Sequence, residues 1–309
     1  MNTNPIKKLL VTGSTGLVGS RFLQLSDKNF QITTIGRSNV DISLNLLSED
    51  EVVKTVTSSD ADAIVNFAAF TNVDGAEKEK GEKQKEVYLL NAMLPLWLAK
   101  TCQDSGKKFY HISTDYVFEG NQDTNPYTED DNPKPVDSWY AQTKYYGEQN
   151  ILNLANAIST SAILRISYPY SGLYQRKLDI ARVVVEKLQK GEEYFGISDQ
   201  KIKPTSVDDI AMALVFLLEK NATGIYHVAG NFSPDKYITP FAFAQSIANT
   251  FSLDKTLIKP ITFEELSKKR VAPRPQHTWL DTKKIESLGL HFTNFDEALK
   301  RFINQIIKK

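Results

Sequence analysis

Short apolar runs alternate with longer mixed segments along the first half of the chain. The runs have little polar alternation, which is typical of parallel strands buried on both faces of a sheet. Segments with helical spacing lie between several of them. The expected strands lie at residues 7–12, 31–36, 63–69, 109–112 and 161–167, and the expected helices at 21–25, 89–99 and 145–152. This alternation predicts an α/β fold with a doubly wound parallel sheet.

The alternation loosens after residue 167. Here the pattern predicts helices at 180–189 and 208–218 and short strands at 193–198 and 225–230, followed by short helices in the last third. The segment 119–137 carries three X-Pro steps and several acids, so we expect an irregular loop that covers the active site.

Composition limits the classes of function. The 309 residues hold 37 Lys+Arg and 37 Asp+Glu, so no basic excess favours nucleic acid or an anionic membrane as a partner. The single Cys102 excludes an internal disulfide and a multi-cysteine zinc site, and no two of the four histidines have metal-ligand spacing. No apolar run reaches membrane-spanning length and the N-terminus does not resemble a signal peptide, so we expect a cytoplasmic protein without a metal.

A glycine-rich turn joins the first expected strand to the first expected helix. It reads Gly13-Ser14-Thr15-Gly16-Leu17-Val18-Gly19. In this context glycines allow the backbone to approach a pyrophosphate, and the helix N-terminus faces the anion. The turn therefore predicts a dinucleotide site, and the small residues Ala68 and Ala69 at the end of the third strand would allow close approach of the same ligand.

The end of the second strand bears on cofactor choice. NAD-selective sites normally have an acidic residue there for the ribose hydroxyls. This chain has Arg37 and Ser38 instead, which suit a 2′-phosphate and predict NADPH, with NADH possible as a second cofactor. Asp41 would either contact the adenine end or cap a turn.

Tyr140 and Lys144 are the candidate catalytic pair. Their spacing places them about one turn apart on one helix face. A phenol is a weak acid near neutral pH, and we expect the ammonium to favour the phenolate and lower its pKa. Thr114 follows Ser113 at the carboxyl end of an expected strand, where open α/β sheets bind ligands. Together these groups can polarise a carbonyl and give it a proton.

Asn91 and the basic turn 268–275 each have two possible roles. Asn91, a polar residue in the apolar run 89–99, is either a structural hydrogen-bonding residue or part of a proton relay beneath the tyrosine. The basic turn 268–275 is either a solvated loop or an anion clamp formed by Arg270 and Arg274.

The chain resembles the extended short-chain dehydrogenase/reductase family, and within it the dTDP-4-dehydrorhamnose reductase branch. The resemblance runs from Lys7 to about Phe302 and rests on motifs in the family's order. These are Thr12-Gly13-x-x-Gly16-x-x-Gly19, the segment 66–74 (NFAAFTNVD), the segment 113–120 (STDYVFEG), Pro126-Tyr127-Thr128-Glu129, Tyr140-x-x-x-Lys144-x-x-Gly147-Glu148, Lys203-Pro204-Thr205 before Asp209-Ile210-Ala211, and Arg274-Pro275 before Leu280-Asp281-Thr282-Lys283.

The resemblance implies a Rossmann-type NADP-binding domain over residues 1–167, its sheet completed by parts of 193–230, and a smaller α/β substrate-binding region over 168–309. It implies reduction of a nucleotide-linked 4-keto-6-deoxy sugar, giving dTDP-L-rhamnose for cell-surface polysaccharide. Tyr140 would protonate the C4 oxygen, Lys144 would hold the nicotinamide ribose and tune the phenol, and Thr114 would bind the substrate oxygen. A homodimer is compatible with the resemblance.

The implied binding residues form two groups. For the cofactor they are Gly13, Ser14, Thr15, Gly16, Leu17, Val18, Gly19, Arg37, Ser38, Asp41, Ala68, Ala69, Thr71, Asn91, Tyr140 and Lys144. For the sugar nucleotide they are Val73, Asp74, Asp115, Val117, Tyr168 and Arg274.

The chain departs from the branch at three places. Relatives often have a Trp-Val-Tyr type segment where this chain has Tyr168-Pro169-Tyr170, Glu119 stands where Asp is usual, and 177–195 matches loosely. These departures affect the identity of the sugar nucleotide more than the reaction.

Two alternatives remain. In one, the chain is a sugar-nucleotide dehydratase or epimerase; Tyr116 after Asp115 lacks the carboxylate that dehydratases similar to this family use. In the other, it is a non-catalytic NADP-binding module similar to the regulatory β subunit of methionine adenosyltransferase.

Overall fold

A computed structural model describes residues 7–26, 28–174, 176–233 and 235–307. Its centre is a seven-stranded sheet with all neighbours parallel, in the order β10-β6-β5-β4-β1-β2-β3. The strands are β1 (Lys8–Thr12), β2 (Gln31–Gly36), β3 (Ile42–Ser43), β4 (Ala63–Asn66), β5 (Lys108–Thr114), β6 (Ser161–Ile166) and β10 (Gly224–Val228). The predicted doubly wound α/β fold is confirmed.

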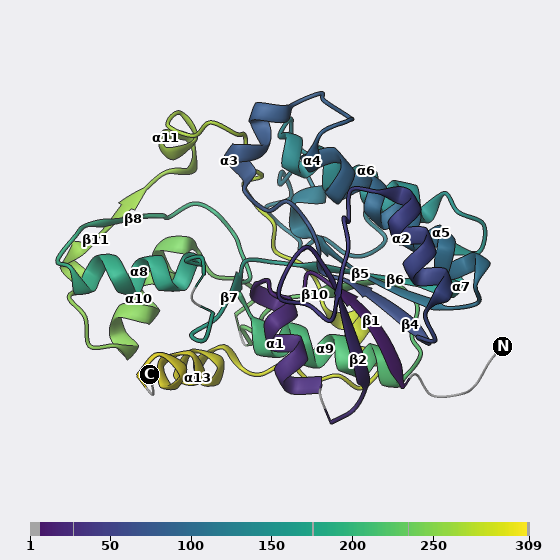
Figure 1. Cartoon of the computed structure of the whole chain (residues 1–309). Helices are drawn as coiled ribbons and strands as arrows, with labels where there is room; N and C mark the ends of the chain where they lie inside the picture. Colours follow the sequence, from purple (N-terminus) through teal and green to yellow (C-terminus); the bar gives the residue numbers. More distant parts are fainter. Residues whose placement is uncertain (1–6, 27, 175, 234, 308–309) are drawn as a thin grey trace.

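Helices cover both faces of this sheet, and Figure 1 shows the two layers. One face packs against α1 (Leu17–Ser26) and α9 (Val207–Glu219). The other packs against α2 (Glu49–Ser58), α5 (Leu94–Asp104) and α6 (Trp139–Leu152). Because both faces are covered, the strands β1, β4 and β6 are almost entirely buried, which explains their continuous apolar sequences.

A second, smaller body lies beside the carboxyl ends of the strands (Figure 1). Its core gathers side chains from α8 (Ile180–Gln189), α10 (Pro240–Thr250) and α13 (Phe295–Ile307). Short parallel pairs, β8 (Tyr194–Ile197) with β11 (Ile258–Ile261) and β7 (Pro169–Tyr170) with β9 (Thr205–Ser206), lie outside the large sheet. The remaining helices are α3 (Val73–Ala76), α4 (Glu86–Tyr88), α7 (Ala157–Thr160), α11 (Phe263–Ser267) and α12 (Lys283–Ser287), with 3-10 turns η1 (Glu77–Glu79), η3 (Asp115–Val117) and η4 (Lys255–Leu257).

The apolar run predicted as one helix over 89–99 is helical throughout but changes type within it. Residues Leu89–Met93 form a π-helical segment, η2, and α5 begins at Leu94 with Pro95 in its first turn. Proline has no backbone N–H, which suits the start of a helix and interrupts one that continues through it. The predicted helix is therefore present, with a π-helical stretch before Pro95.

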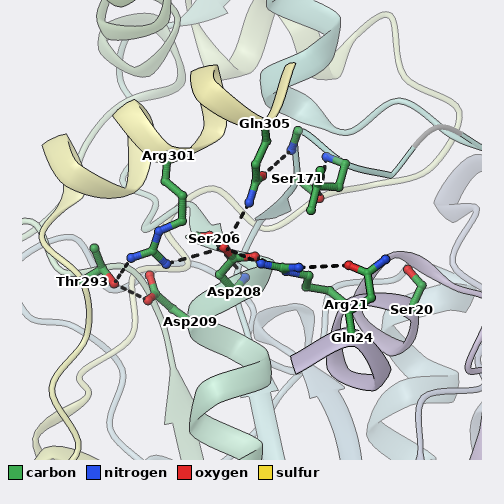
Figure 2. Close-up of polar contacts among 12 residues, drawn as sticks. Ser20, Arg21, Gln24, Ser171, Ser206, Asp208, Asp209, Thr293, Arg301 and Gln305 are labelled. Atoms are coloured by element: carbon green, nitrogen blue, oxygen red, sulfur yellow. Dashed lines mark hydrogen bonds and ion pairs between the residues drawn. The ribbon is translucent and has the colours of Figure 1, made fainter. Parts of the chain in front are cut away.

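A polar cluster around the buried carboxylate of Asp208 joins the two bodies (Figure 2). Asp208, at the start of α9, accepts hydrogen bonds from Arg21 Nε at 2.6 Å and Nη2 at 3.2 Å, and from Gln305 Nε2 at 3.0 Å. Gln305 Oε1 in turn accepts from the backbone N–H of Gly172 at 3.2 Å. One carboxylate therefore links helix α1, which follows the glycine turn, to the C-terminal helix α13.

Among the described helices, none combines the length and the apolar character that a bilayer crossing requires.

Candidate active site

A cavity of about 680 Å³ opens at the carboxyl ends of the parallel strands. Its wall includes the glycine turn, the ends of β2, β4, β5 and β6, the start of α6, and residues 177–180 that lead into α8. This is the position at which open α/β sheets bind their ligands, and the volume is in the usual range for such sites.

The glycine turn forms a close-packed cradle. Gly13 has φ of +63°, and a Cβ there would lie 2.5 Å from the backbone nitrogen of Ala68. A Cβ on Gly19 would lie 2.4 Å from Gly13 O. Only glycine fits either position, so the backbone can approach a ligand closely, as a dinucleotide requires. Of the predicted cofactor residues, the cavity wall includes Gly13, Ser14, Thr15, Gly16, Leu17, Val18, Gly19, Arg37, Ser38, Ala68, Ala69, Thr71, Tyr140 and Lys144.

Two predicted cofactor residues lie elsewhere. Asp41 is outside the cavity wall, and its carboxylate accepts hydrogen bonds from the backbone N–H and the hydroxyl of Thr34, both at 2.8 Å. These bonds hold the pKa of Asp41 below its usual range. Of its two interpretations, the structure agrees with the turn cap, since both contacts are local.

Asn91 uses its amide to join segments of the fold. Its Oδ1 accepts from the backbone N–H of Phe70 at 2.8 Å, and its Nδ2 donates to Phe70 O and to Thr143 Oγ1, each at 3.1 Å. The side chain is fully buried and is absent from the cavity wall. The structure thus agrees with the structural interpretation of Asn91 and not with the relay.

Arg37 reaches the cavity from the turn after β2. Its side chain is 80% exposed and lies 3.5 Å from Glu86 Oε1. An ion pair as open to water as this one contributes little, so the guanidinium is free to contact an incoming anion.

Tyr140 stands at the start of α6, buried between Thr114 and Tyr116. The Thr114 hydroxyl is within hydrogen-bonding reach of the phenol, and the Tyr116 ring meets the Tyr140 ring edge-on at 5.6 Å. Burial is the main influence on the phenol, and it raises the pKa well above 10. The expectation that Lys144 would lower this pKa is therefore wrong for the protein without a ligand, because desolvation dominates.

Lys144 is also buried, one turn further along α6. Its Nζ donates to Ile112 O at 2.8 Å and lies 3.3 Å from Nε2 of His111. Burial lowers the pKa of Lys144 to about 8, although the nearby Glu148 carboxylate acts in the opposite direction. Its charge therefore changes near the pH at which most enzymes work.

Some of the predicted substrate residues line the cavity, whereas Asp74, Val117 and Arg274 lie outside its wall. Val73, Asp115 and Tyr168 line the cavity. Burial raises the pKa of Asp115 to about 6, and its Oδ2 accepts from the Ser167 hydroxyl at 2.9 Å. Val117 is fully buried in a cluster with Phe118 and does not reach the cavity, because η3 turns its side chain into the core.

Asp74 and Arg274 contact each other, although 200 residues separate them. Arg274 Nη2 donates to Asp74 Oδ2 at 2.9 Å, and Nη1 donates to Ala272 O at 3.0 Å. Neighbouring Arg270 has a buried Nη1 with no hydrogen-bond partner among the described residues. The basic turn thus has one guanidinium, that of Arg274, paired with Asp74, and another, that of Arg270, whose Nη1 has no partner among the described residues.

The loop 119–137 lies away from the cavity wall, so the expectation that it covers the site is wrong. Its Tyr127 is buried, bridges to Leu280, and stacks on Phe118 at 4.1 Å. The cavity wall also includes two segments to which no motif pointed. These are Asn45–Leu47 after β3, and Tyr174 with Lys177–Ile180 before α8. The only signal for the second was its loose match to the family pattern, since neither segment has a recognisable motif.

The model of one family, the RmlD substrate binding domain, matches residues 7–307. The spore coat polysaccharide biosynthesis protein SpsK of Bacillus subtilis is 31% identical, over 96% of this chain and 97% of its own length. The rat methionine adenosyltransferase 2 subunit beta is 30% identical, over 93% of this chain and 84% of its own. The crystal structure of a Bacillus anthracis dTDP-4-dehydrorhamnose reductase in complex with NADP superposes with a TM-score of 0.84 at 26% identity, covering 97% of this chain and 99% of that one.

Proposed function

Because this chain belongs to the RmlD substrate binding domain family, we propose that it is an NADPH-dependent reductase of a nucleotide-linked 4-keto-6-deoxy sugar, with dTDP-4-dehydrorhamnose as the substrate. The observation that carries the proposal is the convergence of Thr114, Tyr140 and Lys144 on one wall of a cavity whose other wall is a glycine cradle. A dinucleotide-binding module needs only the glycine cradle, whereas carbonyl reduction needs the cradle and the three side chains.

The chain's own groups supply the proton chemistry. Thr114 orients the carbonyl oxygen of the sugar, and the Tyr140 phenol donates its proton to that oxygen. The raised pKa of Tyr140 keeps the proton on the phenol until the oxygen gains negative charge. Lys144 in its charged form stabilises the phenolate that remains. NADPH, when bound against the cradle, would supply the hydride.

The sugar nucleotide would enter beside Val73, Asp115 and Tyr168, which line the cavity near Tyr140. Asp115 and the phenol of Tyr168 offer hydrogen-bonding groups for sugar hydroxyls. We further propose that residues 1–167, with strand β10, form the cofactor domain and that 168–309 mainly form the substrate region.

Arg37 is expected to set the cofactor preference. A 2′-phosphate beside Arg37 and Ser38 would gain up to two charge-assisted hydrogen bonds, each worth roughly 1.5–3 kcal/mol when well formed. The exposure of Arg37 favours the low end, so we expect NADPH to be preferred by roughly ten- to a hundredfold. The measurement compares kcat/KM for NADPH and NADH in the native protein and in Arg37→Ala.

In Arg37→Ala the ratio of kcat/KM for NADPH to kcat/KM for NADH should fall close to one, mainly because kcat/KM for NADPH decreases. The matched control is Lys28→Ala, a basic residue outside the cavity wall, which should leave the ratio unchanged. A native protein without preference, or a variant with the native ratio, would remove Arg37 from this role.

Arg274 is expected to bind the substrate diphosphate. Replacing it by Ala should raise KM for the sugar nucleotide more than it lowers kcat, because a contact made equally in the ground state is lost. Lys269→Ala, an exposed change in the same turn, serves as the control. An unchanged KM in Arg274→Ala would mean that Arg274 serves only to hold Asp74.

A non-catalytic role is the second candidate, and the 30% identity to a methionine adenosyltransferase 2 subunit beta is the observation that favours it. In that case the cradle would bind dinucleotide without turnover, and the protein would associate with a larger enzyme. The dehydratase alternative has less support, since Tyr116 offers no carboxylate.

The proposal is tested with a panel of dTDP-, UDP- and GDP-linked 4-keto-6-deoxyhexoses, followed by the loss of NADPH absorbance. We expect turnover, fastest with the dTDP sugar. Binding of NADPH without turnover of any member would favour the regulatory module, and equal rates across the panel would refute the choice of nucleotide.

A further inference from the structure

A row of buried polar side chains lies beneath the catalytic lysine. It runs from Thr12 on β1 through Asn66 on β4 and His111 on β5 to Lys144 on α6. The Thr12 hydroxyl is 2.5 Å from Asn66 Oδ1, Asn66 Nδ2 is 3.1 Å from His111 Nδ1, and His111 Nε2 is 3.3 Å from Lys144 Nζ. Thr12, Asn66 and His111 are fully buried, so bulk solvent does not reach these contacts.

The backbone determines which way the Asn66 amide points. The N–H of Ala68, which can only donate, lies 3.1 Å from Asn66 Oδ1. In this orientation Asn66 Oδ1 accepts from the Ala68 N–H and from the Thr12 hydroxyl, and the same Ala68 N–H also lies 3.2 Å from Thr12 Oγ1. Turning the amide over would place the Asn66 NH₂ beside the Ala68 N–H and leave that N–H with the Thr12 hydroxyl oxygen as its acceptor.

The amide in turn determines the tautomer of His111. With Oδ1 fixed, the NH₂ group of Asn66 faces His111 Nδ1 and must donate to it. Nδ1 therefore carries a lone pair, and the proton of the neutral ring is on Nε2. Burial together with the charge of Lys144 lowers the pKa of His111 well below its usual value, so the ring stays neutral.

The tautomer then bears on the proton count of Lys144. An ammonium has only donors, and it would meet the donor Nε2–H of His111 at 3.3 Å. A neutral amine accepts from Nε2–H with its lone pair and still donates to Ile112 O at 2.8 Å. With the amide in this orientation, the Nε2–H of His111 meets an acceptor only when Lys144 is neutral.

The other charged groups near Lys144 do not remove this conflict. Glu148, one turn further on α6, favours the ammonium, but its carboxylate already accepts from the Ser113 hydroxyl and from Arg165. The Tyr140 phenol, on the same helix, is itself uncharged near neutral pH because burial raises its pKa.

We propose that Asn66 and His111 are positioning residues that favour the neutral amine of Lys144 over its ammonium in the cofactor-free protein. The tautomer follows from the geometry alone, whereas its bearing on catalysis rests on the role proposed above for Lys144. The site would then keep Tyr140 protonated and disfavour the ammonium of Lys144 until a dinucleotide contacts the lysine and replaces the contact with His111.

The first test is the nitrogen-15 spectrum of the histidine rings in the native protein, in which a protonated and an unprotonated ring nitrogen have distinct shifts. His227 is a built-in standard, because its Nε2 faces Arg165 Nη1 at 3.4 Å and its Nδ1 faces Tyr127 O at 3.2 Å. We expect opposite tautomers, with the proton on Nε2 in His111 and on Nδ1 in His227. A proton on Nδ1 of His111 would overturn the proposal.

The second test is Asn66→Asp. A carboxylate accepts from Ala68 N–H, from Thr12 and from Nδ1–H of His111, so the His111 tautomer should reverse while that of His227 stays unchanged. His111 Nε2 then accepts from an ammonium, and the pKa of Lys144 should rise. If activity needs the ammonium, activity is lost as pH rises through this pKa, so the alkaline fall of kcat/KM should move up by about one pH unit or more.

An unchanged tautomer or an unchanged alkaline limb in Asn66→Asp would contradict the proposal, and the native spectrum decides the tautomer even if the variant does not fold. The proton arrangement of His111 and the proposed reductase function can be refuted independently. The expected tautomers in a protein without reductase activity would leave the proton arrangement standing and refute the proposed function.

Discussion

Replacing Tyr140 by Phe is expected to lower kcat by a factor of roughly a hundred or more. The change removes one oxygen and keeps the ring that packs edge-on against Tyr116. The proton that neutralises the developing alkoxide is lost, whereas the glycine cradle and Arg37 are untouched. Affinity for NADPH, measured by fluorescence titration, should therefore remain close to that of the native protein.

Tyr146→Phe is the matched control. Tyr146 lies on the same helix, α6, and packs against Tyr88 and Tyr145 without lining the cavity. We expect near-native kcat from this variant. If Tyr140→Phe also turned over at a near-native rate, Tyr140 would not be the proton donor.

Replacing Arg165 by Met is expected to lower the free energy of unfolding by about 3–5 kcal/mol. Arg165 and Glu148 are both fully buried, and Arg165 Nη2 donates to Glu148 Oε2 at 2.7 Å. The substitution leaves the Glu148 carboxylate buried on α6 without its counter-charge. It also removes the guanidinium that lies 5.0 Å from the centre of the Phe118 ring.

The control is an equally short ion pair on the surface. Lys268 and Glu264 are 2.7 Å apart, but their side chains are 70% and 80% exposed. Lys268→Ala should change the unfolding free energy by no more than about 0.5 kcal/mol, because water screens the pair. Denaturant unfolding of both variants provides the comparison. Similar losses in the two would mean that burial does not determine the strength of the pair.

The order of the main elements was predictable because their signals are local. The predicted strand over 31–36 and the predicted helix over 180–189 match β2 and α8 at both ends. Asp179 caps α8 by accepting from the backbone N–H of Ala181 at 3.0 Å and of Arg182 at 3.1 Å, and the apolar spacing then continues for three turns. Short strands such as β3 were not predicted, because two residues carry no periodic pattern.

The contacts of the site were less predictable because they join distant segments. The positions of Tyr140 and Lys144 on one helix followed from spacing, but their burial did not, and burial reverses the expected shift in the pKa of Tyr140. The pairing of Asp74 with Arg274 depends on tertiary packing across 200 residues. No sequence pattern indicated that His111 contacts Lys144, because this contact depends on how strand β5 packs against helix α6.

The most direct test of the central claim follows the hydride. NADPH carrying deuterium at both C4 positions is incubated with the native protein and dTDP-4-dehydrorhamnose, and the sugar product is analysed by mass spectrometry and proton NMR. The account predicts one deuterium per product molecule, located at C4 of the sugar. A product without deuterium, or a protein that binds NADPH and forms no product, would contradict it.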